Sequence, residues 1–327
     1  MISAANHEPI TKAIEFLAER QRPSGELATE ISPDREMLID CQDDGAVFTT
    51  SIVAYSLAFL GDDARAQKVR EQALDFLESE QIPPGIWRYW TFASGKTIAA
   101  DVDDTAFISL VLEQNGRGKK LRASNRPFLL ANRNRDGLFQ TWLSHGQLND
   151  VDSVANANVL LYLGDGPETA RAAAYLNDLI HRDAVAGSIW YYSCERALEY
   201  AMARALYHGN KSLLPSAPQL EARILRCRRD DGSFGNELET ALAISSLMLL
   251  AEARGQEAPL GILQAASSWL VARQQEDGGW RRLAYYQGPA PPTPTAYYFG
   301  SRELTTALCL EALARCRRAS PAQRPVG

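Results

Sequence analysis

A segment that recurs along the chain constrains the fold more than any other feature. A complete copy has an aromatic residue followed by Leu, then Gln four positions after the Leu, Gly four positions later, and an aromatic residue two positions beyond the Gly. The two complete copies run from Phe76 to Trp87 and from Trp269 to Trp280. Weaker copies keep the register, and the glycines of the six copies are Gly25, Gly85, Gly137, Gly187, Gly232 and Gly278. Consecutive glycines are 45 to 60 residues apart, which leaves room for two helices and two loops in each interval.

The spacing within this segment predicts the end of a helix. Leu and Gln, four residues apart, share one helix face, and we expect the Gly to be the left-handed C-terminal cap, with the aromatic residue folded back onto the helix end. The other helix of each interval is rich in Ala and Leu around most of its circumference, which is typical of a buried helix. These buried helices are expected to start near Asp43, Asp103, Asp152, Cys194, Leu238 and Leu304.

The alternation of half-polar and apolar helices predicts the fold class. Six helical hairpins, each with one outer and one inner helix, close most simply into two concentric rings of six helices. We therefore expect an all-α protein with a single (α/α)6 barrel, or toroid, over residues 1–317. Residues 318–327 are expected to form a flexible C-terminal tail.

Composition and charge exclude several classes of protein. A net charge of -6 and a pI near 5.4 leave no basic surface for nucleic acid. The first residues lack a cationic segment followed by an apolar run, and no stretch approaches the roughly 20 apolar residues that cross a bilayer. We expect a cytoplasmic protein, with contact to a membrane surface left open. The five cysteines and four histidines are scattered without the spacing of a metal site built from nitrogen and sulfur ligands.

Two motifs resemble a known family. The repeated segment resembles the QW motif of squalene-hopene cyclases, and residues 101–106, Asp-Val-Asp-Asp-Thr-Ala, resemble the DxDDTA motif of class II terpenoid cyclases. The resemblance implies protonation-initiated cyclisation of a polyprenyl substrate, with an isoprenoid small molecule as the partner and no required cofactor. It also implies that Asp103 is the proton donor, that Asp104 is its hydrogen-bond partner, and that Asp101 shapes the site.

The three carboxyl groups of this motif suit acid chemistry. Protonating an alkene produces a carbocation, so the reaction needs a strong acid that stays protonated inside a dry cavity. Three carboxyls within four residues cannot all ionise cheaply, and their repulsion raises at least one pKa. The alternative is that Asp101 is only a helix N-cap and Asp104 only an acidic residue of the first turn. Asp103 aligns with Leu238 and Leu304 of later repeats, so its carboxyl interrupts an apolar pattern and we expect it to be functional.

Further carboxylates align with Asp103. Asp43 and Asp152 are placed at the same inward position of the first and third repeats, with Asp40, Asp44 and Asp150 beside them. Three interpretations follow: these groups tune the pKa of Asp103, they bind Mg²⁺ that holds a substrate diphosphate, or they form a solvated acidic rim.

Aromatic residues gather in the loops between outer and inner helices. Ring faces stabilise cations, so we predict a substrate-binding set beside the acidic positions Asp43 and Asp152. Trp87 belongs to the repeat and is expected to be structural. The predicted aromatic members of the substrate-binding set are Tyr89, Trp90, Trp190, Tyr298 and Phe299.

The mouth of a single barrel must be covered during such a reaction. Related cyclases usually carry a second helical barrel, and this chain is too short for one. We expect the loops 86–100 and 281–300 to cover the mouth, with the proline-rich stretch 288–300 as a stiff flap. A homodimer or a membrane surface is the alternative cover.

Other functions on this fold remain open. Protein prenyltransferases share it, but neither an Asp-x-Cys nor a downstream His at a helix start matches their zinc ligands in this chain. The alternatives are a non-catalytic barrel that binds a lipid or a protein, and a Mg²⁺-dependent enzyme that processes prenyl diphosphates.

Overall fold

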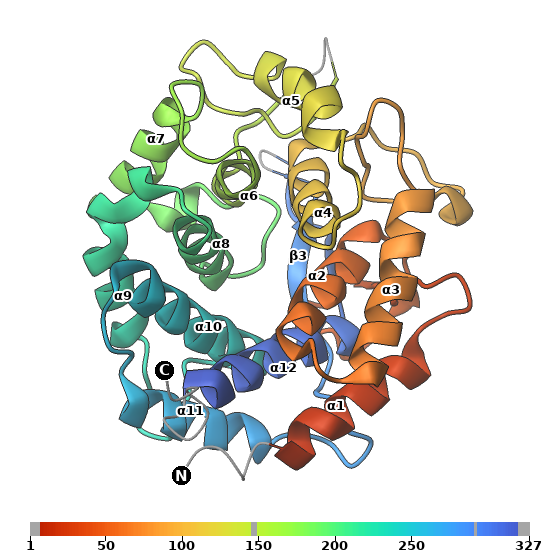
Figure 1. Ribbon diagram of the computed structural model, residues 1–327, viewed down its shortest axis with the longest axis vertical. Helices are drawn as coiled ribbons and strands as arrows, with labels where there is room; N and C mark the ends of the chain where they lie inside the picture. Colours follow the sequence, from red (N-terminus) through yellow and green to blue (C-terminus); the bar gives the residue numbers. More distant parts are fainter. Residues whose placement is uncertain (1–6, 145–148, 291–292, 320–327) are drawn as a thin grey trace.

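Two concentric rings of helices form the molecule (Figure 1). The computed structural model describes residues 7–144, 149–290 and 293–319. The outer ring consists of α1 (His7–Arg20), α3 (Ala64–Ser79), α5 (Leu121–Ala131), α7 (Ala170–His181), α9 (Ala217–Arg226) and α11 (Leu260–Val271). The inner ring consists of α2 (Val47–Leu57), α4 (Val102–Gln114), α6 (Ser153–Leu163), α8 (Arg196–Tyr207), α10 (Glu237–Arg254) and α12 (Arg302–Ala319). The inner ring closes because α12 packs against α2 as well as against α10. The predicted (α/α)6 toroid is confirmed.

The inner helices are buried on nearly every side. All residues of α2 are buried, as are Ser153 to Tyr162 of α6, which explains why neither segment has a polar face. Within the described ranges, short 3-10 helices also join the elements, and they are η1 (Ala58–Leu60), η2 (Phe92–Ser94), η3 (Val185–Gly187) and η4 (Lys211–Ser216). Helix α12 continues to Ala319, and residues 320–327 of the predicted tail lie outside the described residues.

The repeated segment ends each outer helix and ties it to the next inner helix. The indole Nε1 of Trp87 donates to the carbonyl oxygen of Leu77 at 2.8 Å, and that of Trp280 donates to Leu270 at 2.9 Å. The backbone N–H groups of these two tryptophans donate to the hydroxyls of Thr105 and Thr306, each at 3.0 Å. The aromatic residue therefore folds back onto the helix end as predicted.

The glycines of the segment act differently from the prediction. Gly25 and Gly278 have φ of +92° and +87°, but they lie in tight turns beyond the ends of α1 and α11 rather than at the helix caps. A Cβ on Gly25 would lie 2.1 Å from the carbonyl oxygen of Gln72 in α3, and one on Gly278 would lie 2.3 Å from that of Lys12 in α1. Glycine is needed because the turn touches the backbone of the neighbouring outer helix.

A small antiparallel sheet joins the first and last repeats. Its strands, in the order β2-β1-β4-β3, are β1 (Glu30–Ser32), β2 (Gln42–Asp43), β3 (Leu283–Gly288) and β4 (Tyr297–Ser301). Tyr286 of β3 contacts Phe48 at the start of α2, with ring centroids 5.1 Å apart, so the hairpin lies against the ends of inner helices. The prediction of an entirely helical chain missed this sheet.

None of the helices in the described ranges combines the length and the apolar composition needed to cross a membrane.

Candidate active site

The start of α4 is built around a capping carboxylate. Asp101 has an extended backbone, and its Oδ1 accepts a hydrogen bond from the backbone N–H of Asp104 at 2.7 Å. The backbone N–H of Asp101 donates to the carbonyl oxygen of Trp87 at 3.1 Å. The motif thus starts the helix and fixes it to the preceding repeat, so the structural role considered for Asp101 is present.

Asp103 is held by groups from two other parts of the barrel. Asn158 of α6 donates from Nδ2 to Oδ1 of Asp103 at 2.6 Å, and the hydroxyl of Tyr192 donates to Oδ2 at 2.5 Å. Asp103 keeps some accessible surface, whereas Asp101 and Asp104 are only 5% and 2% exposed. The middle carboxyl is therefore the one that is oriented by two donors and still reachable.

A hydrogen bond that recurs from repeat to repeat defines how the repeats align with one another. In five repeats a side chain of the inner helix accepts a hydrogen bond from the backbone N–H of the last residue of the repeated segment, and these side chains are Thr50, Thr105, Asn156, Thr240 and Thr306. The residues two positions earlier are Phe48, Asp103, Val154, Leu238 and Leu304. Asp103 is the polar member of this set, and the other four are buried and apolar.

This register corrects the alignment of two predicted carboxylates. Asp43 lies in β2, four residues before α2 begins, and Asp152 is the N-cap of α6, which makes it the counterpart of Asp101. Asp152 accepts hydrogen bonds from four backbone N–H groups, those of Val154, Ala155, Trp190 and Tyr191. The sequence alignment was wrong because loops of different length precede the inner helices.

Burial raises the pKa of all three carboxyls of the motif. Burial raises the pKa of Asp103, while hydrogen bonds from Tyr192 and Asn158 and the charge of Arg204 act in the opposite direction. Burial and then repulsion from Asp103 raise the pKa of Asp101 to about 7. The pKa of Asp104 is raised well above its ordinary value by burial and by Asp101, with which its side chain interacts. The charge of Asp104 is therefore coupled to that of Asp101, while its buried Oδ2 has no hydrogen-bond partner, so the predicted hydrogen bond from Asp104 to Asp103 is not seen among the described residues.

A group of aromatic rings adjoins Tyr192, the hydrogen-bond partner of Asp103. The ring of Tyr192 contacts those of Tyr285 and Tyr286, with centroids 5.2 and 5.1 Å apart. Tyr286 also contacts Tyr89 at 6.3 Å, and Tyr89 contacts Phe299 at 5.7 Å. Two predicted residues, Tyr89 and Phe299, thus join a continuous group of rings with Asp103's partner. Tyr285 and Tyr286 were missed by the sequence reasoning.

The remaining predicted aromatic residues lie around this group. Trp90 donates from Nε1 to Asp44 at 3.2 Å. The backbone N–H of Trp190 donates to Asp152 at 2.6 Å, and its side chain is half-buried. Tyr298 is half-buried on β4, where it pairs with Ser32 of β1.

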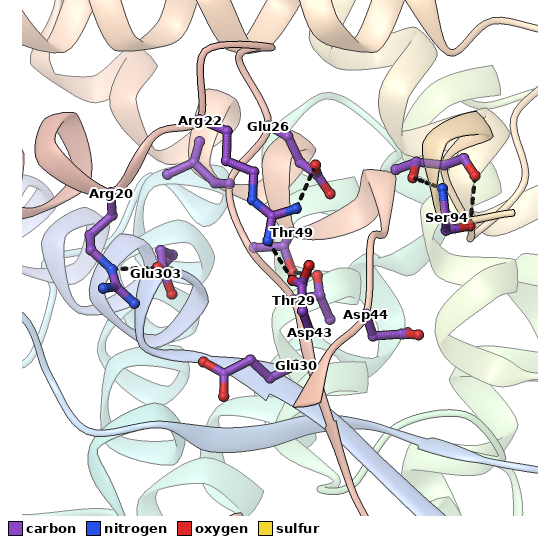
Figure 2. Close-up of polar contacts among 12 residues, drawn as sticks. Arg20, Arg22, Glu26, Thr29, Glu30, Asp43, Asp44, Thr49, Ser94 and Glu303 are labelled. Carbon is purple, nitrogen blue, oxygen red and sulfur yellow. Dashed lines mark hydrogen bonds and ion pairs between the residues drawn. The ribbon is translucent and has the colours of Figure 1, made fainter. Parts of the chain in front are cut away.

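Two carboxylates of the predicted acidic rim, Asp43 and Asp44, form ion pairs. Figure 2 shows Arg22 between Glu26 and Asp43, with Asp44 pointing away from them. The ion pairs of Arg22 with Glu26 and Asp43 measure 2.8 and 2.5 Å. Asp44 pairs with Lys96 at 2.5 Å. Within the part of the chain that is described, no three His, Cys, Asp or Glu side chains are grouped so that they could hold a metal ion.

A buried arginine, which the sequence reasoning missed, adjoins the acid site. Arg204 of α8 is 1% exposed and donates from Nη2 to Oδ1 of Asn158 at 3.0 Å. Asn158 therefore contacts both Asp103 and Arg204. The available signal was an arginine in the middle of an Ala- and Leu-rich inner helix.

Comparison with known proteins places this geometry in context. No family model matches the chain. Drimenyl diphosphate synthase from Streptomyces showdoensis is 30% identical over 256 residues, covering 75% of this chain and 47% of that protein. Squalene-hopene cyclase from Zymomonas mobilis is 24% identical, covering 86% of this chain and 50% of that protein. The chain spans about half the length of these curated relatives.

Solved structures decide the fold. Type II terpene cyclase MstE from Scytonema superposes with a TM-score of 0.73 at 19% identity, covering 96% of this chain and 99% of that one. The chain has the fold of a type II terpene cyclase. A variant of MstE has been solved in complex with geranylgeranyl dihydroxybenzoate, and ent-copalyl diphosphate synthase from Streptomyces platensis has a TM-score of 0.62 at 22% identity. The predicted relationship to the terpenoid cyclases is confirmed.

Proposed function

We propose that this chain is a class II terpene cyclase, which starts the cyclisation of a polyprenyl substrate by protonating an alkene, and that Asp103 is the general acid. The observation that carries the proposal is the position of Asp103, a carboxyl where the other repeats have buried apolar residues. A buried carboxyl held by two donors and kept reachable is expensive for the fold and useful for acid chemistry. The relatedness to squalene-hopene cyclase and drimenyl diphosphate synthase supports the same reaction class.

The proposed chemistry begins with proton transfer from Asp103 to one carbon of the terminal alkene. The other carbon becomes a cation, and the next alkene of the folded chain attacks it, which closes a ring. Loss of a proton or capture of water ends the cascade, and Asp103 regains a proton before the next turnover. Asp101 and Asp104 assist because their own raised pKa values place protons next to Asp103.

The rings around Asp103 would stabilise the cations. Tyr89, Phe299, Tyr285, Tyr286 and Phe48 form the aromatic group nearest to the acid's partner Tyr192. A desolvated ring face stabilises a cation by about 0.5–2 kcal/mol. Trp90, Trp190 and Tyr298 extend this proposed substrate surface along the mouth.

The hairpin formed by β3 and β4 is the proposed cover. It carries Tyr285 and Tyr286, both buried, across the ends of the inner helices. A protein that covers its own mouth in this way needs neither a second barrel nor a partner subunit to exclude water. We propose a cytoplasmic enzyme that needs no cofactor for protonation, with Mg²⁺ involved only through a substrate diphosphate.

Product analysis tests the proposal. The purified chain is incubated with farnesyl diphosphate, geranylgeranyl diphosphate, geranylgeranyl dihydroxybenzoate and squalene, and extracts are examined by mass spectrometry. We expect at least one cyclic product that retains its head group. Release of diphosphate would indicate ionisation instead, and tight binding without turnover would favour a non-catalytic lipid-binding barrel.

A further inference from the structure

Two hydrogen bonds connect inner helix α8 to the acid. Nη2 of Arg204 in α8 donates to Oδ1 of Asn158 at 3.0 Å, and Nδ2 of Asn158 in α6 donates to Oδ1 of Asp103 at 2.6 Å. Arg204 and Asn158 are 1% and 0% exposed, so both side chains are shielded from solvent. The three side chains come from three different repeats, and both hydrogen bonds run in the same direction, from the arginine toward the acid.

The chemistry of arginine sets this direction. An amide side chain accepts on one side and donates on the other, and rotation by half a turn exchanges the two. A guanidinium has only donors and keeps its charge. Asn158 must therefore turn its oxygen toward Arg204, and its NH2 group is the part that meets Asp103.

Arg204 is held in a way that favours this one contact. Within the described part of the chain, its Nε and Nη1 atoms are buried and have no hydrogen-bond partner. The guanidinium carbon lies 4.2 Å from the ring centroid of Tyr200, 4.5 Å from that of Phe107 and 5.5 Å from that of Tyr55. Ring faces stabilise a cation without offering it a carboxylate that would compete with Asn158.

A second buried arginine of the inner ring shows the contrast. Nε of Arg315 in α12 lies 2.8 Å from Oε1 of Glu311, so this positive charge has a bonded counter-ion. A carboxylate beside Arg204 would likewise take its donors and neutralise its charge. The rings leave that charge free to act on Asp103, whose pKa it lowers.

We propose that Arg204 is a positioning residue for the proton transfer, because it fixes Asn158 as a hydrogen-bond donor to Asp103. The inference rests on the proposed function, in which Asp103 is the acid. In that step the O–H bond of Asp103 breaks, a C–H bond forms with the π electrons of the alkene, and the electron pair of the O–H bond stays on the carboxyl group. The fixed N–H and the positive charge behind it stabilise this carboxylate more than the neutral acid, which lowers the barrier.

A reversed amide would have the opposite effect. With its oxygen toward Asp103, Asn158 would accept a hydrogen bond from the neutral acid and would disfavour the carboxylate. The proton would then be held by the amide instead of being presented to the alkene. An apolar side chain in place of Arg204 permits this reversal, since nothing then requires the amide oxygen on that side.

The other groups around Asp103 stay in place when Arg204 is replaced. The groups that face Asp103 are Asp101 and Asp104 at the start of its own helix, Asp152 at the start of α6, Tyr192 before α8, Tyr285 and Tyr286 on β3, and Arg204 itself. Arg204 is the cation of this set. Its loss therefore removes a positive charge as well as the orientation of the amide, and both changes raise the pKa of Asp103.

Nuclear magnetic resonance of the carboxyl carbons tests the role without any turnover. The pKa of Asp103 is measured in protein labelled with ¹³C-aspartate, and Asp103→Asn assigns its resonance. In Arg204→Met, which keeps the length of the side chain but removes its donors and charge, we expect this pKa to rise by about 1 unit or more. Arg204→Lys should reverse part of the rise. The matched control is Arg254→Met in α10, whose arginine pairs with Glu221 at 2.5 Å and which should leave the pKa unchanged.

Two further measurements exclude a merely structural role. The melting temperature of Arg204→Met should equal or exceed that of the parent, because a buried charge with a single hydrogen bond is costly to the fold. Arg204→Gln is the second variant if Arg204→Met does not fold: it lacks the charge and no longer dictates which way the amide of Asn158 points, so the pKa of Asp103 should rise there too. An unshifted pKa in a folded variant would overturn the proposal.

Kinetics show whether Arg204 acts through Asn158. In Arg204→Met we expect kcat to fall about tenfold or more, with KM within about twofold of the parent because Arg204 does not touch the substrate. The same substitution in an Asn158→Ala background should cause a smaller further loss, since the contact is already absent. Losses that multiply in full, or a rise in KM alone, would contradict the positioning role.

The positioning role and the proposed function fail separately. A raised pKa of Asp103 in Arg204→Met, in a chain that forms no cyclic product, would contradict the proposed function and leave the positioning role standing. Cyclic product formed by Arg204→Met with the kcat of the parent and an unshifted pKa would contradict the positioning role and leave the proposed function standing.

Discussion

The starts of α4 and α10 share a capping side chain and a threonine, and they differ in the residue two positions before the threonine. Each helix has an N-cap side chain that accepts from the backbone N–H three residues later, Asp101 in α4 at 2.7 Å and Asn236 in α10 at 2.9 Å. Each has a threonine that accepts from the backbone of the preceding aromatic residue. At the third position α10 has Leu238, which packs in the core, and α4 has Asp103.

This comparison separates the residues that stabilise the barrel from Asp103, the residue that is proposed to catalyse the reaction. The capping side chains of α4, α6 and α10 and the hydrogen bond from the repeated segment recur in several hairpins, so they serve the fold. A leucine at the position of Asp103 would pack at least as well as the aspartate does. The carboxyl adds only the free-energy cost of its burial to the fold. The site is therefore a local substitution in a repeated scaffold, supported by Asn158 and Tyr192 from the next two repeats.

The largest effect is expected from Asp103→Asn, which keeps the shape of the side chain and removes its proton. Activity should fall by about 10²–10⁴ or more, the usual contribution of a positioned general acid. The circular dichroism spectrum and the unfolding midpoint should stay close to those of the parent, because the amide oxygen still accepts from Asn158 and the hydroxyl of Tyr192 can accept from the new NH2 group. A variant that turns over like the parent would remove Asp103 from the mechanism.

The two complete copies of the repeated segment provide a matched pair for stability. Trp87→Ala and Trp280→Ala each remove a fully buried ring and should cost about 3–5 kcal/mol of unfolding free energy. Only Trp87→Ala should also reduce activity at low temperature, because the backbone of Trp87 binds Asp101. Denaturant unfolding and product assays measure the two effects. An unchanged unfolding free energy in either variant would show that this ring does not stabilise its helix end.

Tyr192→Phe should shift the pH dependence of the reaction. The acid must be protonated, so activity falls as pH rises through the pKa of Asp103. The hydroxyl of Tyr192 stabilises the ionised form, and its removal should move this fall upward by about 1–2 pH units, given the strength of a hydrogen bond to a charged group. A profile of kcat against pH that does not move, or moves downward, would contradict the assigned contact.

A smaller effect is expected from Asp101→Asn, which gives α4 the same cap residue as α10. The pKa of Asp101 is about 7 in the folded chain, above the value in the unfolded chain. The contribution of Asp101 to the free energy of unfolding is therefore fully present below the unfolded pKa and is lost as the pH rises through the folded pKa. Each unit of difference corresponds to about 1.4 kcal/mol. The variant keeps the cap, and its unfolding free energy should depend less on pH than that of the parent. An equally steep dependence would assign the effect to other carboxyls.

The repeat made most of the fold predictable from the sequence. The stop segment, the six apolar helices and the inward direction of Asp103 all follow from patterns within about 15 residues. The sheet did not, because β1 and β2 have three and two residues, and β1 pairs with β4 across most of the chain. Tyr285 and Tyr286 were missed for that reason, since they belong to a stretch that was predicted only as a loop.

Contacts between side chains of different repeats could also not be predicted from the sequence. Asn158 lies 55 residues from Asp103 and 46 from Arg204, so no local spacing links these three side chains. Asp43 and Asp152 were aligned by residue type, whereas the correct register depends on the hydrogen bond that joins Thr105 to Trp87.

The isotopic composition of the product tests the central claim most directly. In ²H₂O the proton on Asp103 exchanges for deuterium before each turnover, and protonation transfers it to carbon. The account predicts one solvent deuterium at a non-exchangeable position of each cyclic product molecule, with the head group retained. A cyclic product formed without solvent deuterium at the initiating carbon and with loss of the head group would contradict it.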